Sequence, residues 1–193
     1  MDQKEEIIKA MFEVFSEKGY NASMADISKK VGIKPQSIYS HFESKDEIVW
    51  IVLEREIDTK FEFLRGKIEK SKNESCEVAL KKIAFAIYDY FNDYKKLKFW
   101  RNISLIQNEE IRKKCQEKIR FSEGSNRKEM VSIFQVGAEK REIKSNHLEG
   151  VMILYLSMIQ GILDGMLLYN DSRVDMKDYA KITWDAFWDG IKK

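Results

Sequence analysis

The stretch that decides the fold is residues 23–49, which read SMADISKKVGIKPQSIYSHFESKDEIV. It opens with Ser23 three residues before Asp26, a spacing like that of a capping box, in which side chains satisfy unpaired N–H groups at a helix start. Gly32 is placed to end this helix, and Pro35 to begin a second one at a position where proline loses no hydrogen bond. The stretch therefore predicts two short helices joined by a glycine turn.

A third helix follows, because Ser44 and Glu47 have the S-x-x-E spacing of a full capping box. The turn between the first two helices is predicted to pack on a small apolar core formed by Ile27, Val31, Ile33 and Ile38. This packing leaves the outer face of residues 35–41 free, and a helix presented in this way fits a DNA major groove about 12 Å wide. On spacing alone, a DNA-binding helix-turn-helix and a plain packing corner are equally good interpretations.

The side chains around the second helix suit two kinds of DNA contact. Gln36 can pair with adenine through two hydrogen bonds, and Ser37 can donate or accept one. Hydroxyl, imidazole and ammonium groups suit phosphates, as do the free N–H groups at helix starts. We therefore predict base contacts for Lys34, Gln36 and Ser37, and phosphate contacts for Ser23, Tyr39, His41, Ser44 and Lys45.

The same stretch resembles the DNA-binding motif of the TetR family, whose hallmark is a tyrosine, then a His-Phe pair, then a lysine that opens the next helix. Tyr39, His41, Phe42 and Lys45 hold these positions here. The resemblance implies an all-α homodimer in which an N-terminal helix-turn-helix binds operator DNA. It also implies that the C-terminal region binds a small molecule, and that this displaces the helix of residues 47–70, which connects it to the DNA-binding part.

Two departures from the family pattern are visible. Ser28 stands where the family usually has alanine, which is a small change. Lys34, Pro35 and Gln36 replace the more frequent serine and glycine before the recognition helix. Because these positions face bases, the resemblance implies DNA binding without indicating which sequence is bound.

The rest of the chain also indicates helices. A single proline and nine glycines among 193 residues make a protein of strands and tight turns hard to build. Apolar periodicity predicts about nine helices, near 2–18, 23–31, 35–42, 47–70, 76–94, 97–107, 109–140, 147–169 and 175–191, with a break at Gly124-Ser125 left open. The predicted domains are residues 1–46 for DNA binding and 47–193 for ligand binding and dimerisation.

The charge distribution excludes a broad polyanion-binding surface. The net charge is +2, and residues 1–70 hold 12 Lys and Arg against 14 Asp and Glu. Any contact with nucleic acid must therefore be local. Residues 27–45 are the candidate, because they contain four lysines and only one acidic residue.

Residues 151–169 form an apolar run close to the length that crosses a bilayer. Gln160 and Asp164 lie near its middle, where a carboxylate is costly in lipid, so we interpret the run as a helix buried on all sides rather than a membrane span. Cys76 and Cys115 cannot form a disulfide framework, and no leader-like segment precedes the first helix. A reduced cytoplasm is the expected location.

Two further sites are predicted in the C-terminal region. Small residues at a spacing of four on the helix near 147–169, together with the apolar last helix, predict a dimer interface. Its predicted members are Ser157, Gly161, Gly165, Ile182, Trp184, Phe187 and Trp188. The alternative is that these two helices lie centrally in a monomer. An aromatic ligand pocket is predicted to include Tyr88, Phe91, Trp100, Phe121, Phe134 and Tyr155, although each also suits a plain core.

The sequence does not favour an enzyme. With two histidines, no nucleotide-binding or hydrolase motif and no paired Cys or His spacing, we expect no catalytic residues, no metal and no cofactor. The predicted function is that of a regulator, a repressor released from a palindromic or pseudo-palindromic operator by a small-molecule effector. An activator and a helical interaction protein that does not bind DNA remain the alternatives.

Overall fold

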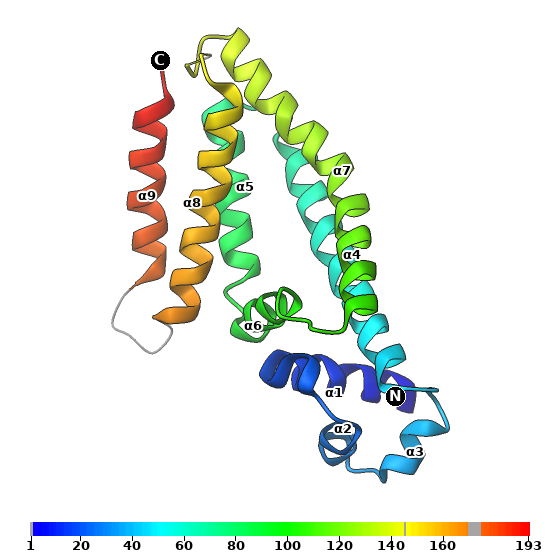
Figure 1. Ribbon diagram of the computed structural model, residues 1–193. Coiled ribbons are helices and arrows are strands. Elements are labelled where there is room, and N and C mark those ends of the chain that lie inside the picture. Colours follow the sequence, from blue (N-terminus) through cyan, green and yellow to red (C-terminus); the bar gives the residue numbers. More distant parts are fainter. Residues whose placement is uncertain (1, 145, 170–174) are drawn as a thin grey trace. The chain divides into compact units, whose positions relative to one another are not determined.

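The computed structural model describes residues 2–144, 146–169 and 175–193 (Figure 1). In this part of the chain there is no β-strand, and a single isolated bridge pairs Ile143 with Lys192. The helices are α1 (Gln3–Lys18), the 3-10 helix η1 (Gly19–Asn21), α2 (Met24–Val31), α3 (Pro35–Tyr39), α4 (Lys45–Ser71), α5 (Cys76–Tyr90), α6 (Tyr94–Ile103), α7 (Glu109–Glu139), α8 (Leu148–Leu168) and α9 (Met176–Ile191). The predicted all-α class is confirmed.

Each predicted helix is present, with differences at the ends. The recognition helix α3 ends at Tyr39, three residues earlier than predicted. The helix α7 continues through Gly124-Ser125, so the break left open by the sequence does not occur. An isolated glycine costs a helix only about 1 kcal/mol, which the rest of a 31-residue helix easily outweighs.

The described chain forms two compact units. Unit 1 comprises residues 1–60 and 94–122, and unit 2 comprises residues 61–93 and 123–193. The predicted division into residues 1–46 and 47–193 concerns function and stays a prediction. The compact units differ from it, since α6 and the first part of α7 belong to the same unit as the helix-turn-helix.

The core of unit 1 is centred on α1. Ile7 and Met11 are completely buried and Phe15 is 1% exposed, so one face of this helix is covered throughout. The ring of Phe99 on α6 lies 4.9 Å from that of Phe15 and 5.0 Å from that of Phe12, measured between centroids. Apolar contact with α1 therefore fixes α6 in this unit.

Hydrogen bonds reinforce this contact at the end of α1. The side-chain amide of Asn102 on α6 donates to the carbonyl oxygens of Phe15 at 2.8 Å and Ser16 at 3.1 Å. These carbonyls belong to the last turn of α1, where few backbone donors remain, although the N–H of Gly19 also donates to the carbonyl of Phe15. Gly19 follows with a φ of 60° and a ψ of −143°. This conformation has a positive φ, which favours glycine.

In unit 2, α5, α8 and α9 pack against one another (Figure 1). The ring of Tyr155 on α8 is 1% exposed, and its hydroxyl donates to the carbonyl oxygen of Leu80 on α5 at 2.8 Å. Phe187 on α9 lies 5.7 Å from Tyr155 between ring centroids, and Trp184 and Trp188 stack at 6.0 Å. Aromatic side chains thus fill the space between these helices.

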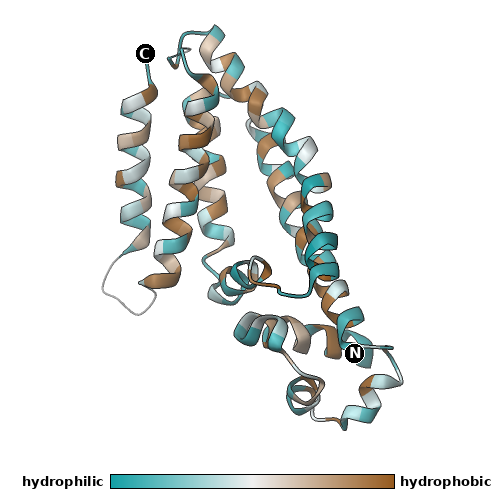
Figure 2. Ribbon diagram, viewed as in Figure 1, coloured by the Kyte–Doolittle hydropathy of each residue, from teal (hydrophilic) through white to brown (hydrophobic). Residues whose placement is uncertain are grey.

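The helix α8 is hydrophobic over much of its length (Figure 2). By length and composition it is the one described helix that meets the criteria for crossing a membrane. We predicted burial on all sides, and this is wrong for the single chain. Ile153, Leu154 and Leu156 are 58%, 53% and 57% exposed, because α5 and α9 cover only the opposite face.

Unit 2 offers a sharp test of close packing at Gly137 on α7. A Cβ atom there would lie 2.6 Å from Sγ and 2.7 Å from Cβ of Cys76, whereas nothing lies within 4 Å of a Cβ built on Gly124 of the same helix. We expect Gly137→Ala to destabilise the protein by about 1–3 kcal/mol through overpacking. Gly124→Ala should be neutral or stabilising by up to about 1 kcal/mol, because alanine is the better helix former. Denaturant unfolding of both variants is the measurement, and equal effects would contradict the packing described.

Candidate nucleic-acid interface

The turn between α2 and α3 has the local structure that its sequence predicts. Ser23 caps α2 through a complete capping box, in which its hydroxyl oxygen accepts from the N–H of Asp26 and the Asp26 carboxylate accepts from the N–H of Ser23. Gly32 ends the helix at a φ of 79° and a ψ of 27°, the left-handed conformation. Pro35 is the first residue of α3. These details fix the direction in which α3 leaves the turn.

The second predicted capping box is only half correct. Ser44 accepts from the N–H of Glu47 at 3.1 Å, as predicted. The carboxylate of Glu47, however, accepts from the N–H of Glu43 at 2.6 Å. The reciprocal bond therefore falls one residue earlier than in a standard box, at the turn that leads from α3 into α4.

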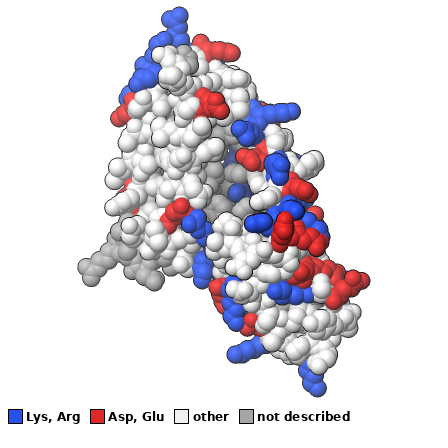
Figure 3. Space-filling model, viewed as in Figure 1, with Lys and Arg blue, Asp and Glu red and all other residues white. Residues whose placement is uncertain are grey.

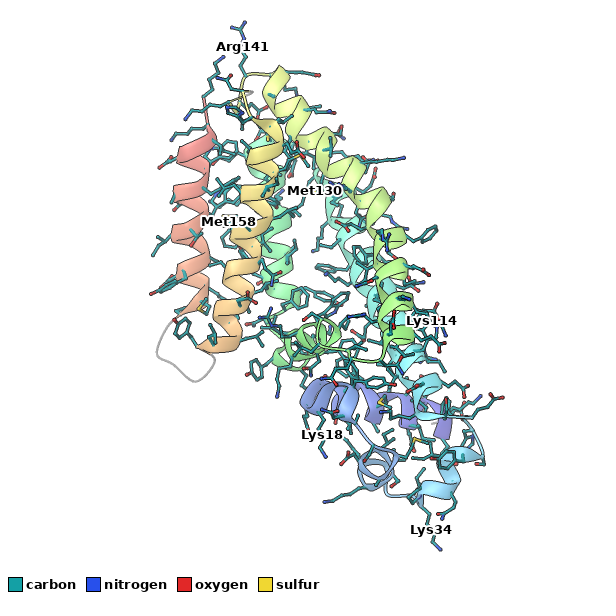
Figure 4. The ribbon with its side chains drawn as sticks, in the orientation of Figure 1. Lys18, Lys34, Lys114, Met130, Arg141 and Met158 are labelled. Carbon is teal, nitrogen blue, oxygen red and sulfur yellow. The ribbon has the colours of Figure 1, made fainter. Side chains whose placement is uncertain are left out.

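One face of α3 is packed and the other is open. Ile38 on α3 and Ile27 on α2 are completely buried, and Phe42 is 3% exposed. Pro35, Gln36 and Tyr39 are exposed, with Tyr39 at 55%. Lys34 lies just before α3, and its side chain extends away from the ribbon (Figure 4). The polar side chains predicted to contact bases thus lie on an open helix face, except for Ser37, which is half-buried.

Not all lysines of the predicted basic segment are available. Lys30 lies 2.6 Å from Glu13 and 3.8 Å from Glu17, and the hydrogen bond with Glu13 raises its pKa. Lys29 and Lys34 are exposed and have no ion pair within the described ranges. Blue side chains project at the tip of unit 1, whereas red and blue are interleaved elsewhere on the visible face of this unit (Figure 3). Lys29 and Lys34 therefore leave positive charge near α3 open to a polyanion.

The residues predicted to contact phosphates differ in how free their side chains are. Tyr39 is open, whereas His41 is half-buried and its Nε2 lies 2.9 Å from Oε1 of Gln3 on α1. Ser44 is exposed, but its hydroxyl oxygen already serves as a helix cap.

The environment of Ser23 argues against its predicted phosphate contact. Its hydroxyl donates to the carboxylate of Asp26 at 2.6 Å. Hydrogen bonds from Lys18 and from Ser23 lower the pKa of Asp26 to about 2, so a negative charge occupies this helix start. A second anion would be repelled there.

Lys45 has an internal role that the sequence did not reveal. Its ammonium group donates to the carbonyl oxygen of Tyr20 at 2.9 Å and lies 4.1 Å from the centroid of the Tyr20 ring. The Tyr20 hydroxyl donates to Asp46 at 2.6 Å and accepts from the side-chain amide of Asn108 at 2.8 Å. We call Tyr20, Lys45, Asp46 and Asn108 the Tyr20 cluster. It joins η1, the first turn of α4 and the residue that caps α7, all within unit 1.

Comparison with known proteins supports this geometry. A sequence model described as "Bacterial regulatory proteins, tetR family" matches residues 7–49, the segment that contains α2 and α3. The biofilm operon icaADBC HTH-type negative transcriptional regulator IcaR of Staphylococcus aureus is 38% identical over 73 residues, which are 37% of this chain and 37% of IcaR. Over this N-terminal segment the chain resembles bacterial regulatory proteins of the tetR family.

Solved TetR-family structures extend the likeness to the whole fold. The transcriptional regulator FadR of Bacillus subtilis, solved in complex with stearoyl-CoA, superposes with a TM-score of 0.73 at 18% identity, covering 98% of this chain and all of FadR. A TetR transcription regulator of Haloarcula marismortui superposes with a TM-score of 0.71 at 17% identity, covering 100% and 99% of the two chains. The sequence match to IcaR spans little more than a third of that protein's length.

The residues predicted to form a ligand pocket are divided between the two units. Trp100 and Phe121 belong to unit 1, and the other four belong to unit 2. Phe121 is 86% exposed, so its assignment to an enclosed pocket is wrong. Within unit 2, the remaining side chains are part of the packed core, namely Tyr88, Phe91, Phe134 and Tyr155.

The predicted interface residues also divide into two sets. Trp184, Phe187 and Trp188 are 1%, 6% and 8% exposed, so the prediction is wrong for them, because the chain itself already covers these rings. Gly165 is buried, and a Cβ atom there would lie 2.7 Å from Cε of Met176. The exposed members are Ser157, Gly161 and Ile182, for which the interface stays a prediction.

No group of three or more His, Cys, Asp or Glu side chains that could hold a metal ion is found among the residues that the structure describes. The free thiols of Cys76 and Cys115 are buried, which raises their pKa to about 12 and about 11. Neither thiol is therefore a ready nucleophile or metal ligand.

The Tyr20 cluster allows a test by pH. Burial and the hydrogen bond to Asp46 raise the pKa of Tyr20 to about 12. Because the pKa is raised on folding, the stabilisation is fully present below pH ~10, the value for free tyrosine, and is lost as the pH rises through about 12. We expect Tyr20→Phe to lower the free energy of unfolding by about 1.5–3 kcal/mol at pH 7, since a bond to a carboxylate is lost.

The difference between the wild type and Tyr20→Phe should shrink as the pH rises above ~10. Unfolding of both proteins in denaturant at several pH values between 7 and 11 provides the measurement. Tyr179→Phe is the matched control, because this tyrosine is 54% exposed and should have little effect at any pH. A difference that does not depend on pH would show that the hydroxyl of Tyr20 contributes nothing through Asp46.

Proposed function

We propose that this protein is a transcriptional regulator that binds double-stranded operator DNA by inserting α3 into the major groove. The observation that carries the proposal is the open polar face of α3, presented by Gln36 and Tyr39 while Ile38 anchors the helix in the core. A helix supported in this manner brings its N-terminal side chains to base edges. The matching family of bacterial regulatory proteins supports the same function.

The chemistry of the exposed side chains supports a division of roles. Gln36 has the amide donor and acceptor that pair with adenine, and Ser37 can assist at a neighbouring base. Lys34 is free of ion pairs within the described ranges and can reach guanine or phosphate. Tyr39, His41 and Lys45 are suited to phosphates, although the last two also make bonds inside unit 1.

Repression released by a small molecule is the form of regulation we favour. IcaR, which resembles the N-terminal region, is a negative transcriptional regulator. FadR, which has the same fold, was solved with a bound acyl-CoA. A ligand that binds one conformation better than another shifts the population of the DNA-binding state. Activation on ligand binding remains the second candidate within the same class.

We further propose that the protein acts as a homodimer through the exposed apolar face of α8 and α9. Ile153, Leu154 and Leu156 on α8 are more than half exposed, as is Ile182 on α9, at 67%. An apolar surface of this extent on a water-exposed helix pair is costly unless a partner covers it. A second copy is the natural partner, because two recognition helices about 34 Å apart can read a palindromic operator.

A mobility-shift assay with fragments of the source genome tests the proposal as a whole. A regulator of this kind should retain a small set of fragments in the presence of excess competitor DNA. A helical interaction protein without DNA-binding activity would shift none of them, and this result would overturn the proposal. The same fragments would then define the operator.

Substitutions of Lys34 and Lys30 distinguish a lysine that contacts DNA from one that is held in an ion pair within the protein. We expect Lys34→Ala to weaken operator binding and to lower the slope of log affinity against log salt by about one per half-site if it contacts phosphate. Lys30→Ala is the matched control, because Lys30 is held by Glu13 and Glu17 and should leave the slope unchanged. Gln36→Ala should instead relax the preference at one base pair by about 1–3 kcal/mol. Binding measured over a salt series and a sequence library decides between these effects.

The dimer is tested at Gly161, which is exposed and has nothing within 4 Å of a built Cβ atom. Gly161→Leu should therefore leave the single chain folded, but should dissociate the dimer because the two helices can no longer approach closely. Operator binding should fall with it, since the second half-site contact is lost. Gly66→Leu is the control, because Gly66 is also helical, exposed and open.

Light scattering gives the mass of each variant, and circular dichroism reports whether it is folded. A Gly161→Leu protein that remains a dimer with normal operator affinity would show that this face is not the interface.

A further inference from the structure

A groove of about 560 Å³ lies between α4 and α5, within unit 2. This volume is within the range of about 300–1,000 Å³ that is typical of small-molecule sites. Its α4 wall includes Phe63, Lys67 and Lys70, and its α5 wall includes Lys82, Phe85 and Tyr90. None of these residues belongs to the aromatic set predicted from the sequence, so the groove is a different site from the one expected.

The spacing of these residues explains how two helices form one groove. On α4 the lining positions are 63, 67, 70 and 71, and on α5 they are 82, 85, 86, 89 and 90. Residues three or four apart share one face of a helix. Each helix therefore presents a single continuous strip of mixed aromatic and basic side chains. A strip meant only for core packing would not carry lysines at the same spacing.

The aromatic part of the groove is already ordered. The rings of Phe63 and Tyr90 lie 4.9 Å apart between centroids, at an angle of 37°. Phe63, Phe85 and Tyr90 are each half-buried, so their ring faces and edges remain partly open to the groove. An aromatic guest gains offset or edge contacts with such rings, worth about 0.5–1.5 kcal/mol each beyond the buried area.

The charged part of the groove is positive. Three lysines and one acidic residue, Asp89, line it. Lys82 is paired with Glu74, whereas Lys67 and Lys70 have no carboxylate partner within the described ranges. The ammonium group of Lys67 lies 5.1 Å from the centroid of the Phe63 ring. A cation beside an aromatic wall is arranged to meet a ligand that carries an anionic group on a flat apolar body.

We propose that this groove binds an organic anion with an aromatic body, and that it is the effector site of the regulator. The effector role rests on the proposed function, whereas the binding of an anion does not. The aromatic body lies against Phe63, Phe85 and Tyr90. The acidic group takes hydrogen bonds from Lys67 and Lys70. A neutral apolar ligand would gain no hydrogen bond from the ammonium groups of Lys67 and Lys70, so an anionic ligand is favoured over it.

Isothermal titration of the full-length protein with 2-naphthoate and with 2-naphthamide tests the proposal, because the two probes share one shape and differ in charge. The acid should bind about tenfold more tightly than the amide, the ratio that one charge-assisted hydrogen bond of ~1.4 kcal/mol provides. Lys67→Gln and Lys70→Gln should each reduce this preference. Lys128→Gln is the control, because Lys128 is exposed on α7 and does not line the groove.

Equal affinity for the two probes, an unchanged preference in both lysine variants, or no binding of either probe up to millimolar concentration would overturn the site. The mobility shift of operator fragments measured without probe is independent of these results. If no fragment is shifted, the proposed function fails while the titration still reports on the groove. If 2-naphthoate binds in the groove but does not change the affinity of the protein for an operator fragment in the mobility-shift assay, the effector role is overturned.

Discussion

The burial of one face of α1 is the constraint on which unit 1 depends. This helix buries seven residues, Ile7, Ile8, Ala10, Met11, Val14, Phe15 and Ser16. Both α2 and α6 pack on it, and its carbonyl end is hydrogen bonded to Asn102. A recognition helix of five residues has too few internal hydrogen bonds to be stable alone. The orientation of α3 is therefore determined by the core beneath it and by the turn at Gly32.

Local rules predicted the helix-turn-helix well because its signals are local. A cap, a glycine in the left-handed conformation and a proline at a helix start each act over three or four residues. Helix positions in the rest of the chain were also readable from apolar periodicity. The same periodicity cannot tell which of two apolar faces is covered. Ile182 and Trp184 on α9 are both apolar, and only contact with α5 and α8 decides that Trp184 is buried and Ile182 exposed.

The remaining features depend on contacts between distant segments. Asn108 meets Tyr20 across 88 residues, and no spacing rule connects them. The groove between α4 and α5 combines two strips from different helices, and no sequence motif connects them. Phe121 shows the opposite error, since an aromatic side chain was expected to be inside and is 86% exposed. Composition alone favours burial of aromatics, but it does not decide individual positions.

The chain connects the two units at three points, which a signal from the proposed effector site could follow. The chain passes between the units at residues 60/61, 93/94 and 122/123. The first and third of these points lie inside continuous helices, α4 and α7. A helix transmits a shift or a rotation along its axis because its backbone hydrogen bonds resist bending. The lining strip of the groove and Asp46 of the Tyr20 cluster are parts of the same helix, α4.

A ligand that moved the α4 wall of the groove would therefore act on the start of α4. There the helix is tied by Asp46 to Tyr20, which follows α1, and Asn108 ties the start of α7 to the same hydroxyl. The two continuous helices thus converge on one tyrosine in unit 1. Such a connection favours movement of the DNA-binding helices as a body, because the Tyr20 cluster and the apolar face of α1 hold them together more firmly than a flexible linker would. The predicted domain boundary after residue 46 would then lie at a position where the hydrogen bonds of the Tyr20 cluster restrict movement.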